Sequence, residues 1–304
     1  MYDIIGDIHG HASVLKRLFT RLGYSENVNG VWEHSERKAV FVGDFINRGP
    51  EIPETISIIK KMVEAEKALA IIGNHEFNAI MYYLRDEEGK LMQKRSSKAR
   101  LTMQHTLSQY ANDPDAWKAA RKFFRRLPLF IDLGNIRFVH GAWVPQHIDL
   151  LKKHFPDGKL RKKHLRKALK NSTVMNALDE TLKGFDYRLP FDLMVRDNRG
   201  INHRSFRIRW WEPMEGKTFR TVSFGNKFEL PAYTIPAEIC NKIESYPEFD
   251  SPVFFGHFCL LSGAEIVARN LCCVDSGIGS TGVLTAYRWS GEQELIKANL
   301  VTAR

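Results

Sequence analysis

Acidic, histidine and amide side chains recur in this chain directly after short apolar runs, each beside a glycine. The segments are Gly6-Asp7-Ile8-His9-Gly10, Gly43-Asp44-Phe45-Ile46-Asn47-Arg48-Gly49, Gly73-Asn74-His75-Glu76, His140-Gly141 and Gly256-His257. Carboxylate, imidazole and amide oxygen, without sulfur, suit borderline or hard divalent metals such as Mn, Fe, Zn or Ni. The glycines let the backbone turn sharply and approach an ion closely. The pattern therefore predicts a metal site.

The number of candidate ligands indicates how many ions the site holds. The candidates are Asp7, His9, Asp44, Asn74, His140 and His257. Six ligands are too many for one tetrahedral ion, but they suit two ions that share a bridging carboxylate. We therefore expect a binuclear centre.

The apolar runs that precede these residues are predicted to be strands. They cover residues 2–6, 39–43, 68–73, 136–139, 252–256 and 271–274, and a last run covers 283–289. Continuous apolar runs of this length are typical of strands that are covered on both faces. Loops at the carboxyl ends of such strands converge, and α/β folds place ligands there.

Helical patterns alternate with the first strands. Residues 14–22 and 52–63 each place apolar side chains on one face, which favours a layered α/β fold. Residues 77–127 look mostly helical and charged, whereas residues 145–250 break the alternation. We predict a single domain over 1–304 with an insertion or cap at about 145–250.

The ordered motifs resemble the calcineurin-like metallophosphoesterases of the phosphoprotein-phosphatase type. That family carries GDxHG, GDxxDRG, GNHE, HG and a late histidine in this order, and the resemblance runs from residue 6 to about 289. The closing stretches 274–277 and 284–289 are most similar to the bacterial branch that includes symmetrical diadenosine tetraphosphatases. The resemblance implies a four-layer α/β/β/α sandwich with two metals at the strand ends.

The resemblance also implies a role for each motif residue. Asp7, His9 and His257 would hold the first metal, Asn74 and His140 the second, and Asp44 would bridge them. A metal-bound hydroxide would attack phosphorus in line. The remaining assignments are Arg48 as a clamp on phosphate oxygens and His75 as proton donor to the leaving oxygen.

Two residues depart from the family pattern. Asn47 stands where the protein-phosphatase branch has an aspartate that orients and charges the GNHE histidine, although the diadenosine branch also lacks that aspartate. Ala142 stands where many relatives have glycine. We expect Asn47 either to weaken His75 as a proton donor or to mark a different substrate class.

Relatives usually carry a second phosphate-clamping arginine in the interval of the predicted cap. Arg207 is our candidate, because it lies in the run Phe206-Arg207-Ile208-Arg209-Trp210. This run precedes residues 219–224, which we expect to form a strand.

Composition excludes several classes of protein. Hydrophobic residues make up 43% and charged residues 26% of the 304 residues, as in ordinary globular proteins. No window approaches 18 apolar residues, so no membrane partner is expected, and the N-terminus lacks the pattern of a secretory signal. Of the four cysteines, Cys272 and Cys273 are adjacent, and no CxxC pair exists. We therefore expect the protein to reside in the reducing cytoplasm.

The net charge of +10 is concentrated in one segment. Residues 152–170 contain nine Lys or Arg against one acid, Asp157, which gives +8. Leu160, Leu165, Ala168 and Leu169 would form the apolar face of a helix there. Two interpretations stay open: a solvated helix face, or a contact for a polyanion near the mouth of the site.

A literal GxGxxG pattern covers residues 277–282. A dinucleotide-binding fingerprint must open a helix, but residues 283–289 look like a strand. We therefore reject a dinucleotide cofactor.

The leading hypothesis is a metal-dependent phosphoesterase acting on phosphomonoesters or dinucleoside polyphosphates. Its cofactors would be two divalent ions, with Mn preferred, and its partners phosphorylated small molecules, nucleotides or phosphoproteins. One alternative is a Ser/Thr phosphoprotein phosphatase. Another is a catalytically degenerate nucleic-acid-binding protein that uses the basic segment.

Overall fold

Two five-stranded sheets form the centre of the computed structural model, which describes residues 1–197, 200–226, 228–240 and 243–304. The first sheet has the strand order β16-β15-β1-β4-β5. Its strands are β1 (Tyr2–Ile5), β4 (Lys38–Phe41), β5 (Ala68–Ala70), β15 (Leu284–Trp289) and β16 (Leu300–Ala303). In this sheet β1, β4 and β5 are parallel, whereas β15 runs antiparallel to β1.

The second sheet has the strand order β13-β14-β12-β7-β6. Its strands are β6 (Phe130–Asp132), β7 (Arg137–Val139), β12 (Val253–Phe255), β13 (Glu265–Ala268) and β14 (Leu271–Cys273). The three central strands β14, β12 and β7 are parallel. All seven apolar runs of the sequence thus lie in strands, as predicted.

Alternate residues of the strands enter different cores, which is why the runs are continuously apolar. Ile4 and Val40 pack between the two sheets against Phe138 and Phe254. Phe41 faces the opposite side of the first sheet, and Phe255 faces the opposite side of the second. Both sheets are therefore covered on both faces.

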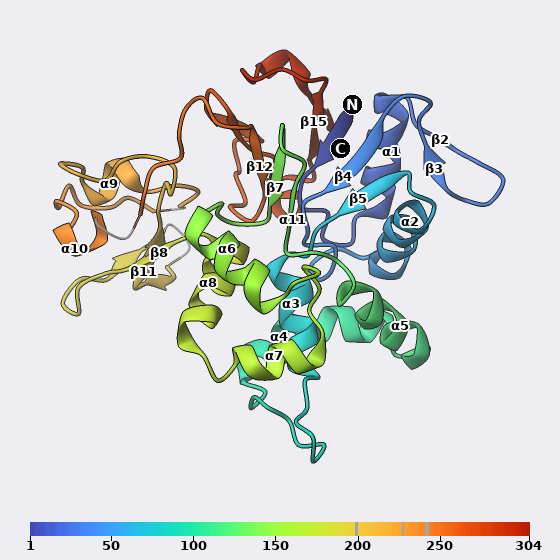
Figure 1. The fold of residues 1–304 in the computed structure, drawn as a ribbon, viewed down its shortest axis with the longest axis horizontal. Helices are drawn as coiled ribbons and strands as arrows, with labels where there is room; N and C mark the ends of the chain where they lie inside the picture. Colours follow the sequence, from blue (N-terminus) through green and yellow to red (C-terminus); the bar gives the residue numbers. More distant parts are fainter. Residues whose placement is uncertain (198–199, 227, 241–242) are drawn as a thin grey trace.

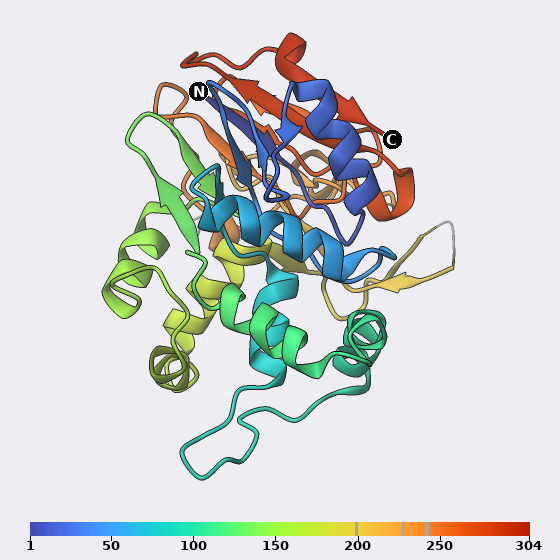
Figure 2. The same ribbon diagram turned by 90° about the vertical axis from the view of Figure 1, so that its right-hand side faces the viewer.

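Helices α1 (Ala12–Leu22) and α2 (Ile52–Glu64) cover the outer face of the first sheet. Figure 2 shows them in front of that sheet. The outer face of the second sheet packs against an aromatic segment that includes Trp210, Trp211 and Phe224. Figure 1 shows the two sheets between these outer layers, so the fold is the expected four-layer sandwich.

The remaining helices of the first half are α3 (Asn74–Tyr82), α4 (Ser97–Gln109) and α5 (Pro114–Phe124). They account for the helical content expected over 77–127. Figure 1 places them below the sheets.

The interval 145–250 combines helices with short strand pairs. Its helices are α6 (Pro145–His154), α7 (Lys162–Ala168), α8 (Ser172–Lys183), α9 (Phe219–Val222) and α10 (Ala237–Cys240). Its strands are β8 (Asp186–Arg188), β9 (Val195–Arg196), β10 (Asn202–His203) and β11 (Ser205–Arg207). The assignment of this interval as a cap stays a prediction.

The expectation of a strand over 219–224 was wrong. Residues Phe219–Val222 form α9, because Thr218 and Thr221 satisfy the first turn reciprocally: the Thr221 N–H donates to Thr218 Oγ1, and the Thr218 N–H donates to Thr221 Oγ1. Such a capping box satisfies two N–H groups that the first turn of a helix otherwise leaves unpaired, and so favours a helix start here.

The basic segment 152–170 is not one helix. Its first residues end α6, a loop follows, and α7 begins at Lys162. Leu165 and Ala168 are buried as predicted. Arg166 donates hydrogen bonds to the carbonyls of Arg85 and Asp86, which follow the carboxyl end of α3. Helix α7 therefore lies at the other end of α3 from Asn74, which argues against the interpretation that places the basic segment near the mouth of the site.

The last elements are the hairpin β2 (Ser25–Glu26) and β3 (Trp32–Glu33), the short helix α11 (Ile278–Thr281) and the 3-10 turn η1 (Lys297–Asn299). Helix α11 is a single turn that leads into β15, so the GxGxxG stretch lacks the long helix of a dinucleotide site. None of the described helices has the length and apolar character needed to cross a bilayer.

Candidate metal centre

Three neighbouring strands of the first sheet present the first group of candidate ligands. The loop after β1 carries Asp7 and His9, the loop after β4 carries Asp44, and α3 begins with Asn74 directly after the β5 segment. Because β1, β4 and β5 are parallel neighbours, these loops share one edge of the sheet.

Two neighbouring strands of the second sheet present the others. His140 follows β7, and His257 follows β12, which pairs in parallel with β7. The side chain of Asn74 joins the two sheets: its Oδ1 lies 3.1 Å from His140 Nε2 and 2.7 Å from His257 Nδ1.

Asp44 lies at the centre of the cluster and is 2% exposed. Its Oδ1 is 3.3 Å from His140 Nε2, and its Oδ2 is 3.7 Å from His9 Nε2 and 3.8 Å from His75 Nε2. Burial alone would raise the pKa of Asp44, but the imidazoles of His140 and His75 hold it well below its usual range. The carboxylate is therefore placed to contact two ions at once.

Potential ligand atoms converge in two groups that share this carboxylate. One is His9, Asp44 and His75, and the other is Asp44, His140 and His257. The family resemblance implies that His257 binds the first metal with Asp7 and His9. The structure places its imidazole in the second group, because β12 is the neighbour of β7 and not of β1. We revise that assignment accordingly.

Hydrogen bonds from Nδ1 to backbone carbonyls fix the orientation of two imidazoles. His9 Nδ1 donates to the Ile46 carbonyl at 2.8 Å, and His140 Nδ1 donates to the Val42 carbonyl at 2.6 Å. These bonds turn both Nε2 atoms toward Asp44, which is the orientation of a metal-bound histidine. Burial lowers the pKa of His9 well below its usual value, so this ring is neutral and able to bind an ion.

Three buried carboxylates gather at the same place. Burial, followed by the charges of Asp275 and Asp44, raises the pKa of Asp7 well above its usual value. Asp275 accepts hydrogen bonds from the Cys259 and Gly277 N–H groups and is 2% exposed. Like charges this close are costly without a counter-charge, and divalent ions supply one. The donor set therefore fits two metal ions.

The loops of the site contain most of the strained backbone. His9, Asp44 and His257 have φ values of 45°, 54° and 70°. Apart from Glu66, the other non-glycine residues with positive φ in the described ranges are Asn47, Arg48 and Cys259, from the same loops. Such conformations cost about 1–3 kcal/mol each and cluster at functional sites.

Glu76 is a structural residue of the site whose role the sequence motifs do not indicate. This fully buried carboxylate accepts hydrogen bonds from the backbone N–H groups of Asp44, Phe45, Ile46 and Gly73 at 2.8–3.2 Å. Burial and the nearby Asp44 raise the pKa of Glu76 to about 7. The glutamate thus ties the Asp44 loop to the start of α3.

Comparison with known proteins identifies this arrangement of motifs. Residues 2–259 match the sequence profile of the calcineurin-like phosphoesterases. The chain belongs to this family.

Among its relatives is the symmetrical bis(5′-nucleosyl)-tetraphosphatase of Proteus mirabilis, with 24% identity over 98% of this chain and 97% of that protein. The asymmetrical enzyme PrpE of Oceanobacillus iheyensis is 32% identical, but the match spans 48% of this chain and 57% of PrpE. The cold-active protein-tyrosine phosphatase of a Shewanella species shares the fold, with a TM-score of 0.54 and 15% identity over 100% of this chain and 80% of that one.

Both arginines singled out in the sequence of this calcineurin-like phosphoesterase line one cavity of about 600 Å³ beside the ligand cluster. Arg48 is exposed there, and its side chain runs past Gly279. Arg207 donates to the carbonyls of His257 and Phe258 at 3.3 and 3.0 Å. Lys98 adds a third cation to the lining. We call this space the catalytic cavity, after the role that we propose for it.

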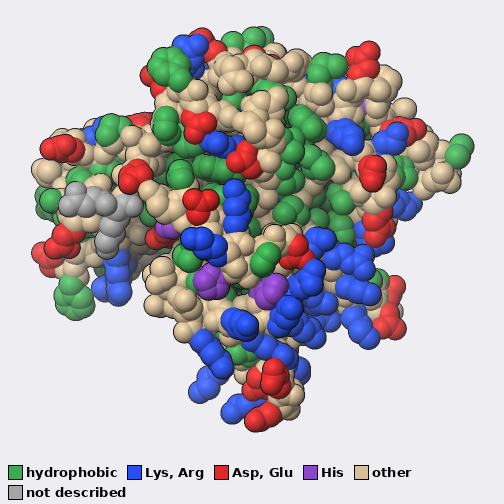
Figure 3. Space-filling view, in the orientation of Figure 1, with side chains coloured by type: hydrophobic (Ala, Val, Ile, Leu, Met, Phe, Trp, Pro, Cys, Tyr) green, Lys and Arg blue, Asp and Glu red, His purple; other side chains and the backbone are tan. Residues whose placement is uncertain are grey.

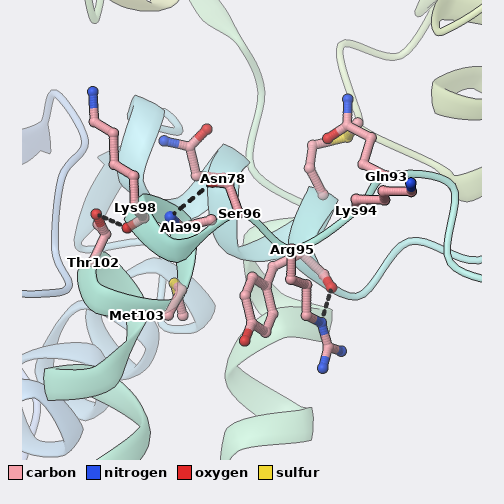
Figure 4. Close-up of a pocket in the computed structure, with 11 residues that line it drawn as sticks. Asn78, Gln93, Lys94, Arg95, Ser96, Lys98, Ala99, Thr102 and Met103 are labelled. Carbon is pink, nitrogen blue, oxygen red and sulfur yellow. Dashed lines mark hydrogen bonds between the residues drawn. The ribbon is translucent and has the colours of Figure 1, made fainter.

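A smaller cavity of about 220 Å³ lies between α3 and α4. Figure 4 shows Asn78 from α3 and Arg95, Lys98 and Met103 from the α4 region around it. The guanidinium of Arg95 lies 4.2 Å from the centre of the Tyr82 ring. Lys98 lines both this space and the catalytic cavity, so the two spaces are neighbours.

Asn47 contacts His75 directly. Its Nδ2 lies 2.6 Å from His75 Nδ1, while its Oδ1 accepts a hydrogen bond from Thr106 Oγ1 at 2.5 Å. Because the Thr106 hydroxyl fixes the amide, Asn47 donates to Nδ1 and leaves the proton of a neutral His75 on Nε2. Burial lowers the pKa of His75, so the ring is a neutral hydrogen-bond donor.

Proposed function

We propose that the protein hydrolyses phosphate esters or anhydrides, with dinucleoside polyphosphates as the favoured substrates. The observation that carries this proposal is the catalytic cavity, which is lined by Arg48, Arg207 and Lys98 with one acid, Asp186. Arg207 connects it to the ligand cluster through its hydrogen bond to the carbonyl of His257. Three cations suit a chain of several phosphates better than a single phosphate. The names of the relatives described above support the same substrate class.

Each residue of the site has a proposed role. Asp7, His9, Asp44, Asn74, His140 and His257 hold two divalent ions, of which we propose Mn, with Fe, Zn or Ni as alternatives. When bound, such ions supply Lewis-acid stabilisation and a nucleophilic water. Arg48 and Arg207 bind the phosphate oxygens, and Lys98 binds phosphates farther along the chain. His75 donates a hydrogen bond from Nε2 to the leaving oxygen.

Chelation tests the proposed metal centre. We expect chelator to abolish hydrolysis of diadenosine tetraphosphate, with a loss of roughly a hundredfold or more, and added Mn to restore it. Elemental analysis of the restored enzyme should give two ions per chain. Full activity in chelator, from protein without bound transition metal, would refute the proposal.

A substrate panel separates this function from its alternatives. Diadenosine tetraphosphate, a phosphoserine peptide and a small aryl phosphate are compared under Mn. Preference for the phosphopeptide would favour a phosphoprotein phosphatase. Salt-sensitive nucleic-acid binding without hydrolysis under any metal would favour the catalytically degenerate protein. The convergence of His9, His140 and His257 on Asp44 argues against that alternative. The cytoplasm stays our proposed compartment, on the cysteine pattern of the sequence.

The contact between Asn47 and His75 gives a second prediction. In Asn47→Asp the new carboxylate would accept a hydrogen bond from His75 Nδ1–H, and its negative charge would stabilise the imidazolium, which is a stronger acid than the neutral ring. We expect a gain of up to about 10²-fold on substrates with poor leaving groups and little change on good ones.

The double variant Asn47→Asp, His75→Ala is the control, because the expected gain in activity requires the His75 imidazole. Steady-state kinetics on an alkyl and an activated aryl phosphate measure both effects. A loss on every substrate would mean that the asparagine is adapted to this enzyme's own substrate.

A further inference from the structure

A second concave and strongly basic site lies away from the catalytic cavity. It has a volume of about 420 Å³ and is bounded by the carboxyl end of α3, by α5 and by the start of α7. Its charged lining consists of Lys118, Arg121, Lys122, Arg125, Lys162 and Asp115. Figure 3 shows Lys and Arg side chains gathered on this part of the surface. We call it the α5 pocket.

The cations of the α5 pocket lack acidic partners. None of the five forms an ion pair with any acid in the described part of the chain, although cations elsewhere do, as Arg37 does with Asp3 and Arg137 with Asp250. Five cations against Asp115 leave a net charge of +4 around one concavity. Unrelieved like charge of this density destabilises a fold, so the arrangement is suited to an anionic ligand.

Arg121 also has a hydrogen-bond donor that lacks an acceptor. Its guanidinium lies 3.8 Å from the centre of the Tyr83 ring, which fixes its plane. Its Nε is buried and has no hydrogen-bond partner. Burial, and then the neighbouring Arg125 and Arg95, lower the pKa of Arg121. A buried donor without an acceptor is unfavourable. An anionic oxygen bound beside Arg121, which lines the α5 pocket, would supply an acceptor.

The α5 pocket is distinct from the proposed metal centre. Helix α3 begins with the candidate ligand Asn74, whereas Tyr83 and Leu84, at its other end, line the pocket. At 1.5 Å per residue the two sites lie roughly 13 Å apart along the helix. Lys159, whose backbone pairs with Pro128 just after α5, connects the basic segment to the same region.

We propose that the α5 pocket binds the oligophosphate chain of a small ligand, either a nucleoside triphosphate or an inorganic oligophosphate. Planar guanidinium groups and flexible ammonium groups from the α5 region and from the start of α7 match several phosphate oxygens at once. The concave shape favours a compact anion over an extended nucleic-acid backbone. This site does not depend on the proposed hydrolysis.

Calorimetric titration of the full chain with ATP and with inorganic tripolyphosphate, both in chelator, tests the proposal. All proteins carry Arg48→Ala and Arg207→Ala, so that the catalytic cavity contributes little. The pocket variant adds Lys118→Gln, Lys122→Gln, Arg125→Gln and Lys162→Gln and keeps Arg121, which packs on Tyr83. The control adds Lys61→Gln, Lys152→Gln, Lys153→Gln and Lys170→Gln, which removes equal charge from exposed positions outside the pocket.

We expect the pocket variant to bind about tenfold or more weakly and the control within about twofold of the parent. Equal binding of ATP and tripolyphosphate would identify the phosphate chain alone as the ligand, and tighter binding of ATP would identify a nucleotide. Equal weakening in both variants, or binding of an RNA oligonucleotide but of neither small anion, would overturn the proposal. Because chelator stops hydrolysis, these outcomes are independent of the proposed function.

Discussion

Replacement of Asp44 by asparagine should lower kcat/KM on every phosphate substrate by roughly a thousandfold or more. The carboxylate is shared by both candidate ligand groups, and an amide cannot offer a negatively charged oxygen to two ions. Loss of residues that merely orient a metal ligand already costs 10–100-fold. The variant is measured with an aryl phosphate and diadenosine tetraphosphate under Mn, together with its metal content.

The matched control is Asp149→Asn, which makes the same change at an exposed position on α6 and should leave kcat/KM within about twofold. An Asp44→Asn protein that is folded, keeps two ions and hydrolyses at the wild-type rate would show that Asp44 is not the bridge.

Glu76→Ala should be the most destabilising single substitution at the site, at about 3–5 kcal/mol of unfolding free energy. The carboxylate is the common acceptor for four backbone N–H groups of two loops. Its removal leaves those donors buried and unsatisfied. The loop that carries Asp44 should then lose its conformation, and the affinity for metal should fall with the stability.

Urea denaturation and metal titration measure the two effects. Glu64→Ala, at the exposed end of α2, is the control and should cost less than about 0.5 kcal/mol. A Glu76→Ala protein with unchanged unfolding free energy would mean that water or other groups satisfy the four donors.

The strands and the set of candidate ligands could be predicted because both are local properties of the sequence. Residues 39–43 and 252–256 are continuously apolar because both faces of each sheet are covered. Each run stops at the residue that enters the site, as Asp44 and His257 do. The polar residue that ends each apolar run therefore marks both the end of a strand and a candidate site residue.

The partners of each residue were harder to predict, because they depend on strand order. His257 joins His140 and Asn74 only because β12 lies beside β7, which no spacing in the sequence reveals. Glu76 gave no separate signal, since its partners are backbone N–H groups that every residue possesses. The helix at 219–222 depends on two threonine hydroxyls, which a pattern of apolar residues does not record.

Because the site is divided between two sheets, the core between them determines the distance between its two halves. Ile4 and Val40 support the loops of Asp7 and Asp44, while Phe138 and Phe254 support those of His140 and His257. Face-to-face sheets pack about 10 Å apart, at a separation that their side chains determine. Exchange of one aromatic ring in this layer would therefore change the distance between the two groups of candidate ligands while every one of those side chains stays the same.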